Sequence, residues 1–173
     1  ASEDTMGPEK TIDGSGLSDN DEHSMALDAM WVSGKGVPMP HWIRYEFDKL
    51  CALDRVIIWN SNQMSESIMG IGAKRITVEY SSDANDWTAL GDFELPQAPG
   101  SSTYVADTTI VFGEVAAKYV RLTMSANYSE FSPQCSLSEV RFYEVPLAAR
   151  KPSPAEGASD VAPGVTLSWR AGR

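Results

Sequence analysis

One loop near the N-terminus has the composition of a site for a hard cation. Residues 10–18 combine the carboxylate of Asp13 with several hydroxyl groups and with two glycines, Gly14 and Gly16. Calcium takes about six to eight oxygens from carboxylates, hydroxyls and backbone carbonyls, and glycines permit the tight bends that aim carbonyls inward. The acidic run 19–22 could add ligands. The same residues also fit an ordinary Asp-Gly turn beside a solvated loop, so both interpretations stay open.

The sequence offers little material for catalysis. His23 and His41 are the only histidines. Cys135 and His23 could act as nucleophile and base, but neither residue lies in a recognisable catalytic motif. With 24 acidic residues in the chain, a pair of carboxylates for glycoside hydrolysis is uninformative, and no phosphate loop, dinucleotide motif or zinc spacing occurs. We therefore expect a binding protein and not an enzyme.

Short β-type segments must position these residues. Several of them alternate apolar with polar side chains, as half-buried strands do, and turn-forming residues separate them. The expected strands cover residues 42–47, 55–60, 75–80, 87–90, 108–112, 119–123 and 140–144. No long stretch has helical periodicity, so the pattern predicts an all-β sandwich or barrel. The expected core residues are Trp42, Tyr45, Phe47, Ile58, Val78, Tyr80, Val120, Leu122 and Val140.

The net charge limits the kinds of partner that the chain could bind, and the composition of the C-terminal segment indicates where the first domain ends. A net charge of −10 disfavours nucleic acid and anionic membranes, which attract basic surfaces, and no apolar run approaches the ~20 residues of a membrane span. Residues 146–164 are rich in proline and glycine, as linkers are, and residues 165–169 alternate again. We expect a sandwich over 1–145, then a linker and the first strand of a truncated β module over 146–173. The alternative is that this strand packs back on the sandwich.

The order of segments resembles the F5/8 type C, or discoidin-like, family, which includes many bacterial carbohydrate-binding modules of the galactose-binding-like fold. The resemblance spans about residues 10–145 and rests on six pieces in the right order. These are IDG at 12–14, MWVS at 30–33, HWIRYEFD at 41–48, YSSDANDW at 80–87, AKYVRL at 117–122 and LSEVRF at 137–142. It implies an antiparallel jelly-roll-like β-sandwich of about eight core strands, with a ligand site in the loops at one end and no catalysis.

The resemblance also implies one structural Ca²⁺. Matched by position, Asp13 and Glu139 would supply carboxylate oxygens. Lys10, Ser15 and Ser138 would supply backbone carbonyls, and Ser18 a hydroxyl where the family often has threonine.

The resemblance implies a ligand site at one end of the sandwich, and the alternating direction of the strands brings loops 19–39, 60–66 and 127–134 to that end. Sugars are bound by planar amide and imidazole groups and by an aromatic face. The residues with this chemistry are His23, Trp31, Asn60, Asn62, Gln63, Tyr128, Phe131 and Gln134. The arginine that galactose binders often carry just after Trp59 is replaced here by Asn-Ser-Asn-Gln, which argues against galactose itself. The alternatives are that Trp31 is core, that His23 is merely exposed, and that Tyr128 or Phe131 plugs the sandwich end.

We therefore expect a non-catalytic carbohydrate-binding module of a larger secreted, extracellular protein. Its partners would be neutral glycans or polysaccharides and other domains of the same parent chain, with no nucleic acid and no membrane. The alternative is a protein–protein or cell-surface adhesion module that uses the same loops, and a third possibility is a structural spacer. Cys51 and Cys135 are predicted to lie at opposite ends of the sandwich and to form no disulfide.

Overall fold

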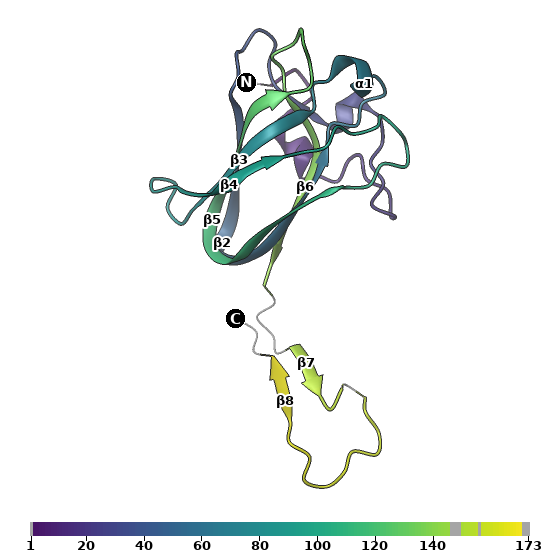
Figure 1. Ribbon diagram of the computed structural model, residues 1–173, viewed down its shortest axis with the longest axis vertical. Helices are drawn as coiled ribbons and strands as arrows, with labels where there is room; N and C mark the ends of the chain where they lie inside the picture. The colour runs from purple at the N-terminus through teal and green to yellow at the C-terminus, as the bar shows by residue number, and fades with distance from the viewer. Residues whose placement is uncertain (1, 146–149, 156, 171–173) are drawn as a thin grey trace.

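Six antiparallel strands form the body of the protein (Figure 1). The structure, a computed structural model, describes residues 2–145, 150–155 and 157–170. The strands are β1 (Trp31–Val32), β2 (His41–Asn60), β3 (Ala73–Ser81), β4 (Thr88–Glu94), β5 (Thr108–Asn127) and β6 (Ser136–Glu144). Their order in the sheet is β1-β6-β2-β5-β3-β4. The all-β antiparallel sandwich expected from the sequence is confirmed.

Two long strands fold the sheet over into two layers. Residues 41–46 of β2 pair with residues 119–124 of β5, and residues 51–58 of β2 pair with residues 108–117 of β5. The register shifts between Glu46 and Cys51, where β2 turns from one layer into the other. A second register shift follows between Leu53 and Arg55, and opposite it β5 contains Gly113, whose φ of +72° favours glycine. When the halves of β2 and β5 are counted separately, the six strands give the eight β-segments of the expected sandwich.

The core lies between these layers and follows the two-residue period of the strands. Six of the predicted core residues are buried: Tyr45, Ile58, Val78, Val120, Leu122 and Val140. Phe47 and Tyr80 are partly buried against the same cluster. The prediction for Trp42 is wrong, because this side chain is 61% exposed. Ile43 and Tyr45 face inward, so alternation turns Trp42 outward.

Short helices occupy some of the connections. They are the 3₁₀ turns η1 (Pro8–Thr11) and η2 (Leu27–Ala29) and the single helical turn α1 (Glu66–Met69). Within the described ranges, no helix has the length and apolar character needed to span a membrane.

The C-terminal segment forms a hairpin of its own. Strand β7 (Arg150–Ser153) pairs antiparallel with β8 (Ser168–Arg170), so the strand predicted at 165–169 begins later and pairs with β7 and not with the six-stranded sheet. The predicted linker residues 146–149 lie outside the described residues.

The two cysteines are free thiols in different parts of the sandwich, as predicted. Cys51 lies at the fold-over of β2, and Cys135 is buried just before β6.

Candidate functional site

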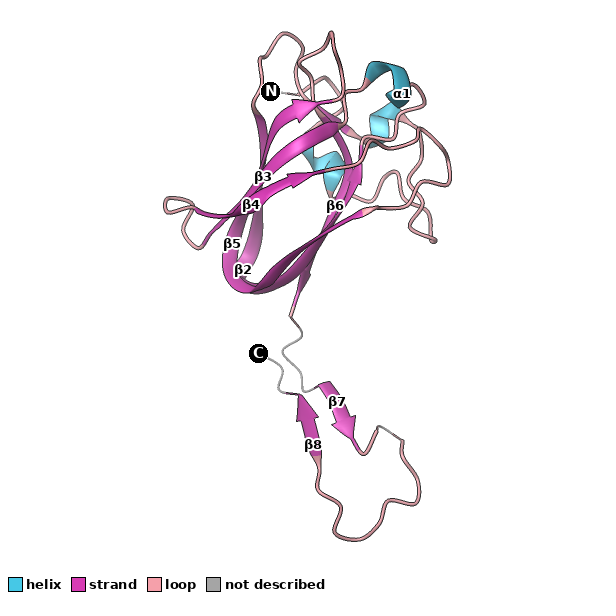
Figure 2. Ribbon diagram, viewed as in Figure 1, coloured by secondary structure: helices cyan, strands magenta, loops and turns pink. Residues whose placement is uncertain are grey.

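The loops gather at the end of the sandwich opposite the fold-over of β2 and β5 (Figure 2). Loop segments 61–72, 95–107 and 127–135 meet there with the N-terminal segment 2–40. This end contains every residue that the sequence suggested for ligand binding, so the topological prediction of which loops meet is correct.

Two of the predicted amides hold the loops together and do not face solvent. Asn60 is buried and donates to the carbonyls of Ala73 at 2.8 Å and Pro96 at 2.7 Å. Asn62 is also buried and donates to the Ser101 carbonyl at 2.7 Å. Because these amide hydrogens already bond to backbone carbonyls that burial removes from water, the side chains stabilise the loop frame. Their contact with a ligand stays a prediction, and in this arrangement their N–H groups already have protein partners.

The glutamine side chains are used in the same way. Gln63 is buried and donates to Glu66 at 3.0 Å, and the other carboxylate oxygen of Glu66 accepts from the Gly72 amide at 2.8 Å. Burial raises the pKa of Glu66, although these hydrogen bonds oppose the change. Gln134 donates to the Ser33 carbonyl at 2.7 Å and so ties two loops together. Neither glutamine is a free donor at the loop end.

His23 and Trp31 belong to the scaffold as well. His23 is fully buried, and a Cβ at Gly16 would lie 2.2 Å from its ring. Its Nδ1 lies 2.9 Å from the Ser24 carbonyl, and burial lowers the pKa of the imidazole, against the effect of that bond. Trp31 is buried in the core, and its indole N–H donates to the Ser2 hydroxyl at 3.1 Å. The ligand role expected for each residue stays a prediction, and both side chains are buried.

The two aromatic residues of loop 127–134 differ from each other. Tyr128 is half-buried, donates its hydroxyl to the Leu95 carbonyl, and carries the Lys74 ammonium 5.3 Å from its ring centroid. Phe131 is 68% exposed. Asn127 braces the loop beneath it by donating to two carbonyls of the same loop, at 2.7 and 2.6 Å. Of the eight predicted ligand residues, Phe131 is the one with a largely exposed face.

Other exposed apolar side chains lie on the loop that adjoins loop 127–134. Met64 and Ile68, in and beside α1, are 74% and 76% exposed. The α1 loop touches loop 127–134, because the Gly70 carbonyl accepts from the Tyr128 amide at 2.8 Å. A Cβ at Gly70 would lie 2.7 Å from the Tyr128 carbonyl carbon, so glycine permits this approach. The loop end thus presents apolar side chains from two adjoining loops.

The glycine-rich loop meets β6 through Glu139. The Gly14 amide donates to Glu139 at 3.3 Å, and only 3% of Glu139 is exposed. Burial raises the pKa of Glu139 to about 7, and the charge of Asp13 adds to this, while the bond from Gly14 opposes it. Burial would also raise the pKa of Asp13, but hydrogen bonds from Ser15 and Lys10 bring it below its usual value. A carboxylate thus lies buried beside a second one.

This arrangement fits a hard cation in its charge and in part of its donor set. Across the described residues no cluster of three His, Cys, Asp or Glu side chains occurs, so further ligands would have to be hydroxyls and carbonyls. Ser18 accepts the amides of Asn20 and Glu22 at 3.3 Å, and Ser138 accepts the Asn62 amide at 3.1 Å. The Ser138 hydroxyl keeps one oxygen lone pair, whereas the two amides occupy both lone pairs of Ser18, which would have to release one of these bonds to bind a cation.

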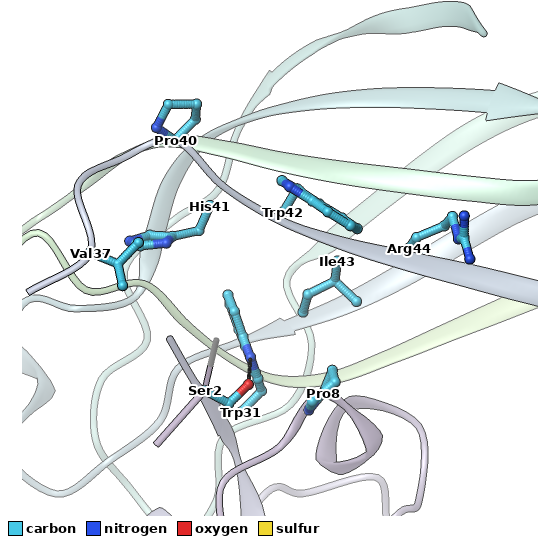
Figure 3. Close-up of a pocket in the computed structure, with 9 residues that line it drawn as sticks. All are labelled: Ser2, Pro8, Trp31, Val37, Pro40, His41, Trp42, Ile43 and Arg44. Atoms are coloured by element: carbon cyan, nitrogen blue, oxygen red, sulfur yellow. Dashed lines mark hydrogen bonds between the residues drawn. The ribbon is translucent and has the colours of Figure 1, made fainter. Parts of the chain in front are cut away.

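Sequence reasoning missed a hollow beside the N-terminal segment. Trp42 and Arg44 lie on the outer face of β2 and help to line a cavity of about 450 Å³ (Figure 3). The alternation around Ile43 and Tyr45 was the available signal for both side chains.

The chain has recognisable relatives among proteins of known family and structure. The family model of the F5/8 type C domain matches residues 1–140, so the chain belongs to this family. A comparison with curated proteins finds no match. Solved structures with the same fold include the module CBM32-3 of a family 31 glycoside hydrolase from Clostridium perfringens. It is 18% identical, with a TM-score of 0.62, over 83% of this chain and 86% of that one.

Two further structures show the same fold with bound sugars. A CBM32 module of Clostridium perfringens in complex with GalNAc-β-1,3-galactose is 15% identical, with a TM-score of 0.60, over 80% of this chain and 85% of that one. The lectin domain of lectinolysin in complex with Lewis B antigen is 13% identical, with a TM-score of 0.55, over 83% of this chain and 88% of that one.

Proposed function

We propose that this chain is a glycan-binding module that uses the loop end around Phe131. The observation that carries the proposal is the exposed phenyl face on a loop held rigid by Asn127. A fixed aromatic face can stack on the C–H groups of a sugar ring with little loss of conformational entropy. Family membership supports this, as do structural neighbours whose ligands are GalNAc, GalNAc-β-1,3-galactose and Lewis B antigen.

Burial of the predicted amides changes the chemistry expected at this site. Asn60, Asn62 and Gln63 are buried in the loop frame, so ligand polar contacts would come from exposed backbone groups and from residues at the rim. A site with one aromatic face and few preorganised donors gives modest affinity. At about −0.3 kcal/mol per heavy atom, a mono- or disaccharide would bind with a Kd of roughly micromolar to millimolar.

A glycan array probed with the full chain and with two variants tests this function. Phe131→Ala should abolish the array signal. Trp87→Ala is the matched control, because Trp87 lies in the β3–β4 turn against Arg121, away from these loops. Equal signals from the two variants would contradict the proposed site.

A protein partner is the second candidate for the same loops. Met64 and Ile68 are apolar and largely exposed in and beside α1, and exposed apolar patches mark protein interfaces. If no sugar on the array binds, and a Met64→Ser, Ile68→Ser double variant loses capture of a defined protein partner, the adhesion function replaces the glycan function.

We further propose that a structural Ca²⁺ is held between the glycine-rich loop and β6. Asp13 and Glu139 would supply the carboxylates, with carbonyls of Lys10, Ser15 and Ser138 and the hydroxyl of Ser18 as further oxygens. The support is the buried Glu139 carboxylate beside Asp13, since a divalent cation would compensate both charges. The ion would stabilise the loop frame and would not touch the sugar.

We also propose a role for the module in its parent protein. It acts without catalysis, as a targeting module within a larger secreted protein. A bound polysaccharide would keep neighbouring domains of that protein near their substrate.

A further inference from the structure

The cavity beside β2 is a second candidate binding site, distinct from the loops around Phe131. Its volume of about 450 Å³ falls within the range of small-molecule sites. Its lining contains one cationic side chain, Arg44, and no carboxylate. In a chain with 24 acidic and 14 basic residues, a cavity lined in this way differs in charge from the surface as a whole.

Trp42 supplies an aromatic face to this cavity. Figure 3 shows its indole along one side, with Trp31 and Pro8 on the other. Trp42 is 61% exposed, and its position near the start of β2, paired with Thr123 of β5, fixes its backbone. A large aromatic ring held on a rigid strand beside a cavity is suited to stacking against a sugar ring.

Arg44 supplies a positive charge without a matched carboxylate. Its cross-strand neighbour Arg121 is neutralised by two hydrogen bonds to Glu79, at 2.8 and 2.9 Å. In the part of the chain that the structure describes, no ion pair joins Arg44 to an acidic residue, and its guanidinium lies 5.6 Å from the Tyr119 ring centroid. The guanidinium fork therefore remains available for an anionic group.

The nearest acidic residue along the same face of β2 is already engaged. Glu46 lies 3.7 Å from the Lys118 ammonium and accepts the Tyr119 hydroxyl at 3.2 Å. Its charge is thus compensated by groups other than Arg44, and the cavity keeps its positive character.

His41 completes the wall and fixes it. The ring is almost fully buried, and its Nε2 lies 2.8 Å from the Pro133 carbonyl, so this nitrogen must carry the proton that is shared with the carbonyl. This bond anchors the start of β2 to loop 127–134. The cavity wall is therefore formed by a strand and a braced loop, as a preorganised site requires.

We propose that this cavity binds an acidic sugar, namely a uronic acid residue of an oligosaccharide. The pyranose ring stacks on Trp42, and the carboxylate accepts the two-pronged hydrogen bonds of Arg44. The inference goes beyond the proposed function, because it names a different surface and a charged sugar class.

The test is an NMR titration of the full chain with tri-galacturonate and, separately, with the carboxyl-reduced, neutral trisaccharide. The indole N–H signal of Trp42 is assigned from its absence in Trp42→Phe. We expect this signal to shift with tri-galacturonate. Trp42→Ala should weaken the affinity at least tenfold. Trp169→Phe is the matched control, because Trp169 is 60% exposed on the C-terminal hairpin, and it should leave the affinity unchanged.

Arg44→Gln separates the charge from the stacking. It should weaken tri-galacturonate about tenfold and leave the neutral trisaccharide within twofold. An unshifted Trp42 signal at millimolar tri-galacturonate would overturn the proposal, as would equal binding of the charged and neutral trisaccharides. If tri-galacturonate does not bind at Trp42 but a neutral glycan binds in a way that depends on Phe131, the cavity proposal fails and the proposed function stands. If tri-galacturonate binds at Trp42 but no glycan binding depends on Phe131, only the loop site is removed.

Discussion

Replacing Glu139 by glutamine should make the calcium-free protein more stable at pH 8, even though a buried native side chain is changed. Burial beside Asp13 raises the Glu139 pKa from 4.5 to about 7. The folded state therefore keeps the proton at pH values where the unfolded chain has already lost it. The free energy of unfolding falls as pH rises from about 4.5 to about 7, and the loss is complete above that range.

The size of the effect follows from that pKa difference. One pKa unit corresponds to about 1.36 kcal/mol, so a rise from 4.5 to about 7 destabilises the ionised protein by about 3 kcal/mol. Glu139→Gln removes the titrating group and keeps its shape. The unfolding free energy of the variant minus that of the wild type should therefore increase by about 3 kcal/mol between pH 4.5 and pH 8. The titration of His23 is present in both proteins and cancels in this difference.

The assay is urea unfolding with a chelator present at pH 4.5, 6, 7 and 8, followed by the same series in millimolar calcium. Calcium should restore the wild type at pH 8 and leave Glu139→Gln nearly unchanged, because a ligand that binds only the native state stabilises it in proportion to ln(1 + [L]/Kd). If the difference in unfolding free energy between the two proteins does not change with pH, the argument from the buried carboxylate is refuted. Calcium insensitivity of the wild type would refute the metal proposal.

Two further predictions concern the loop frame. Asn62→Ala leaves buried carbonyls without donors, so it should lower the free energy of unfolding by about 2–3 kcal/mol. Asn85→Ala, in an exposed turn, is the control and should change the free energy of unfolding by less than about 0.5 kcal/mol. Equal losses for the two variants in urea unfolding would contradict the role given to Asn62. Gly70→Ala and Gly36→Ala both place alanine at positive φ, but only Gly70 has backbone within 3 Å of the new Cβ. Thermal unfolding should therefore show Gly70→Ala to be the less stable variant by at least about 1 kcal/mol.

The strand pattern could be predicted from the sequence because strand burial is local. Alternation at Ile43 and Tyr45 identifies the inward face of β2 without knowledge of the rest of the chain. Trp42 was assigned to the core because it is hydrophobic, although its place in the alternation puts it on the outward face of β2. The fold-over of β2 between Glu46 and Cys51 was expected as two strands with a break, because pairing across a bend depends on β5, which lies far along the sequence.

The loop end could be located but not resolved into ligand contacts and scaffold. Asn60 and Asn62 donate hydrogen bonds to the carbonyls of residues 96 and 101, which lie more than 35 positions away in the sequence. No local pattern reports such contacts. The choice between Tyr128 and Phe131 as the exposed aromatic residue likewise depends on the Leu95 carbonyl, which takes the Tyr128 hydroxyl. The glycine-rich loop could be recognised from the sequence. The burial of Glu139 beside it, which favours a bound cation, could not.

The most direct test of the central claim is an NMR titration of the isotope-labelled full chain with a panel of neutral oligosaccharides containing GalNAc or galactose. We expect saturable shifts confined to loops 61–70 and 127–134, with millimolar or tighter affinity, that persist in chelator and vanish in Phe131→Ala but not in Trp87→Ala. The absence of shifts in these loops at millimolar concentrations of every sugar would contradict the account.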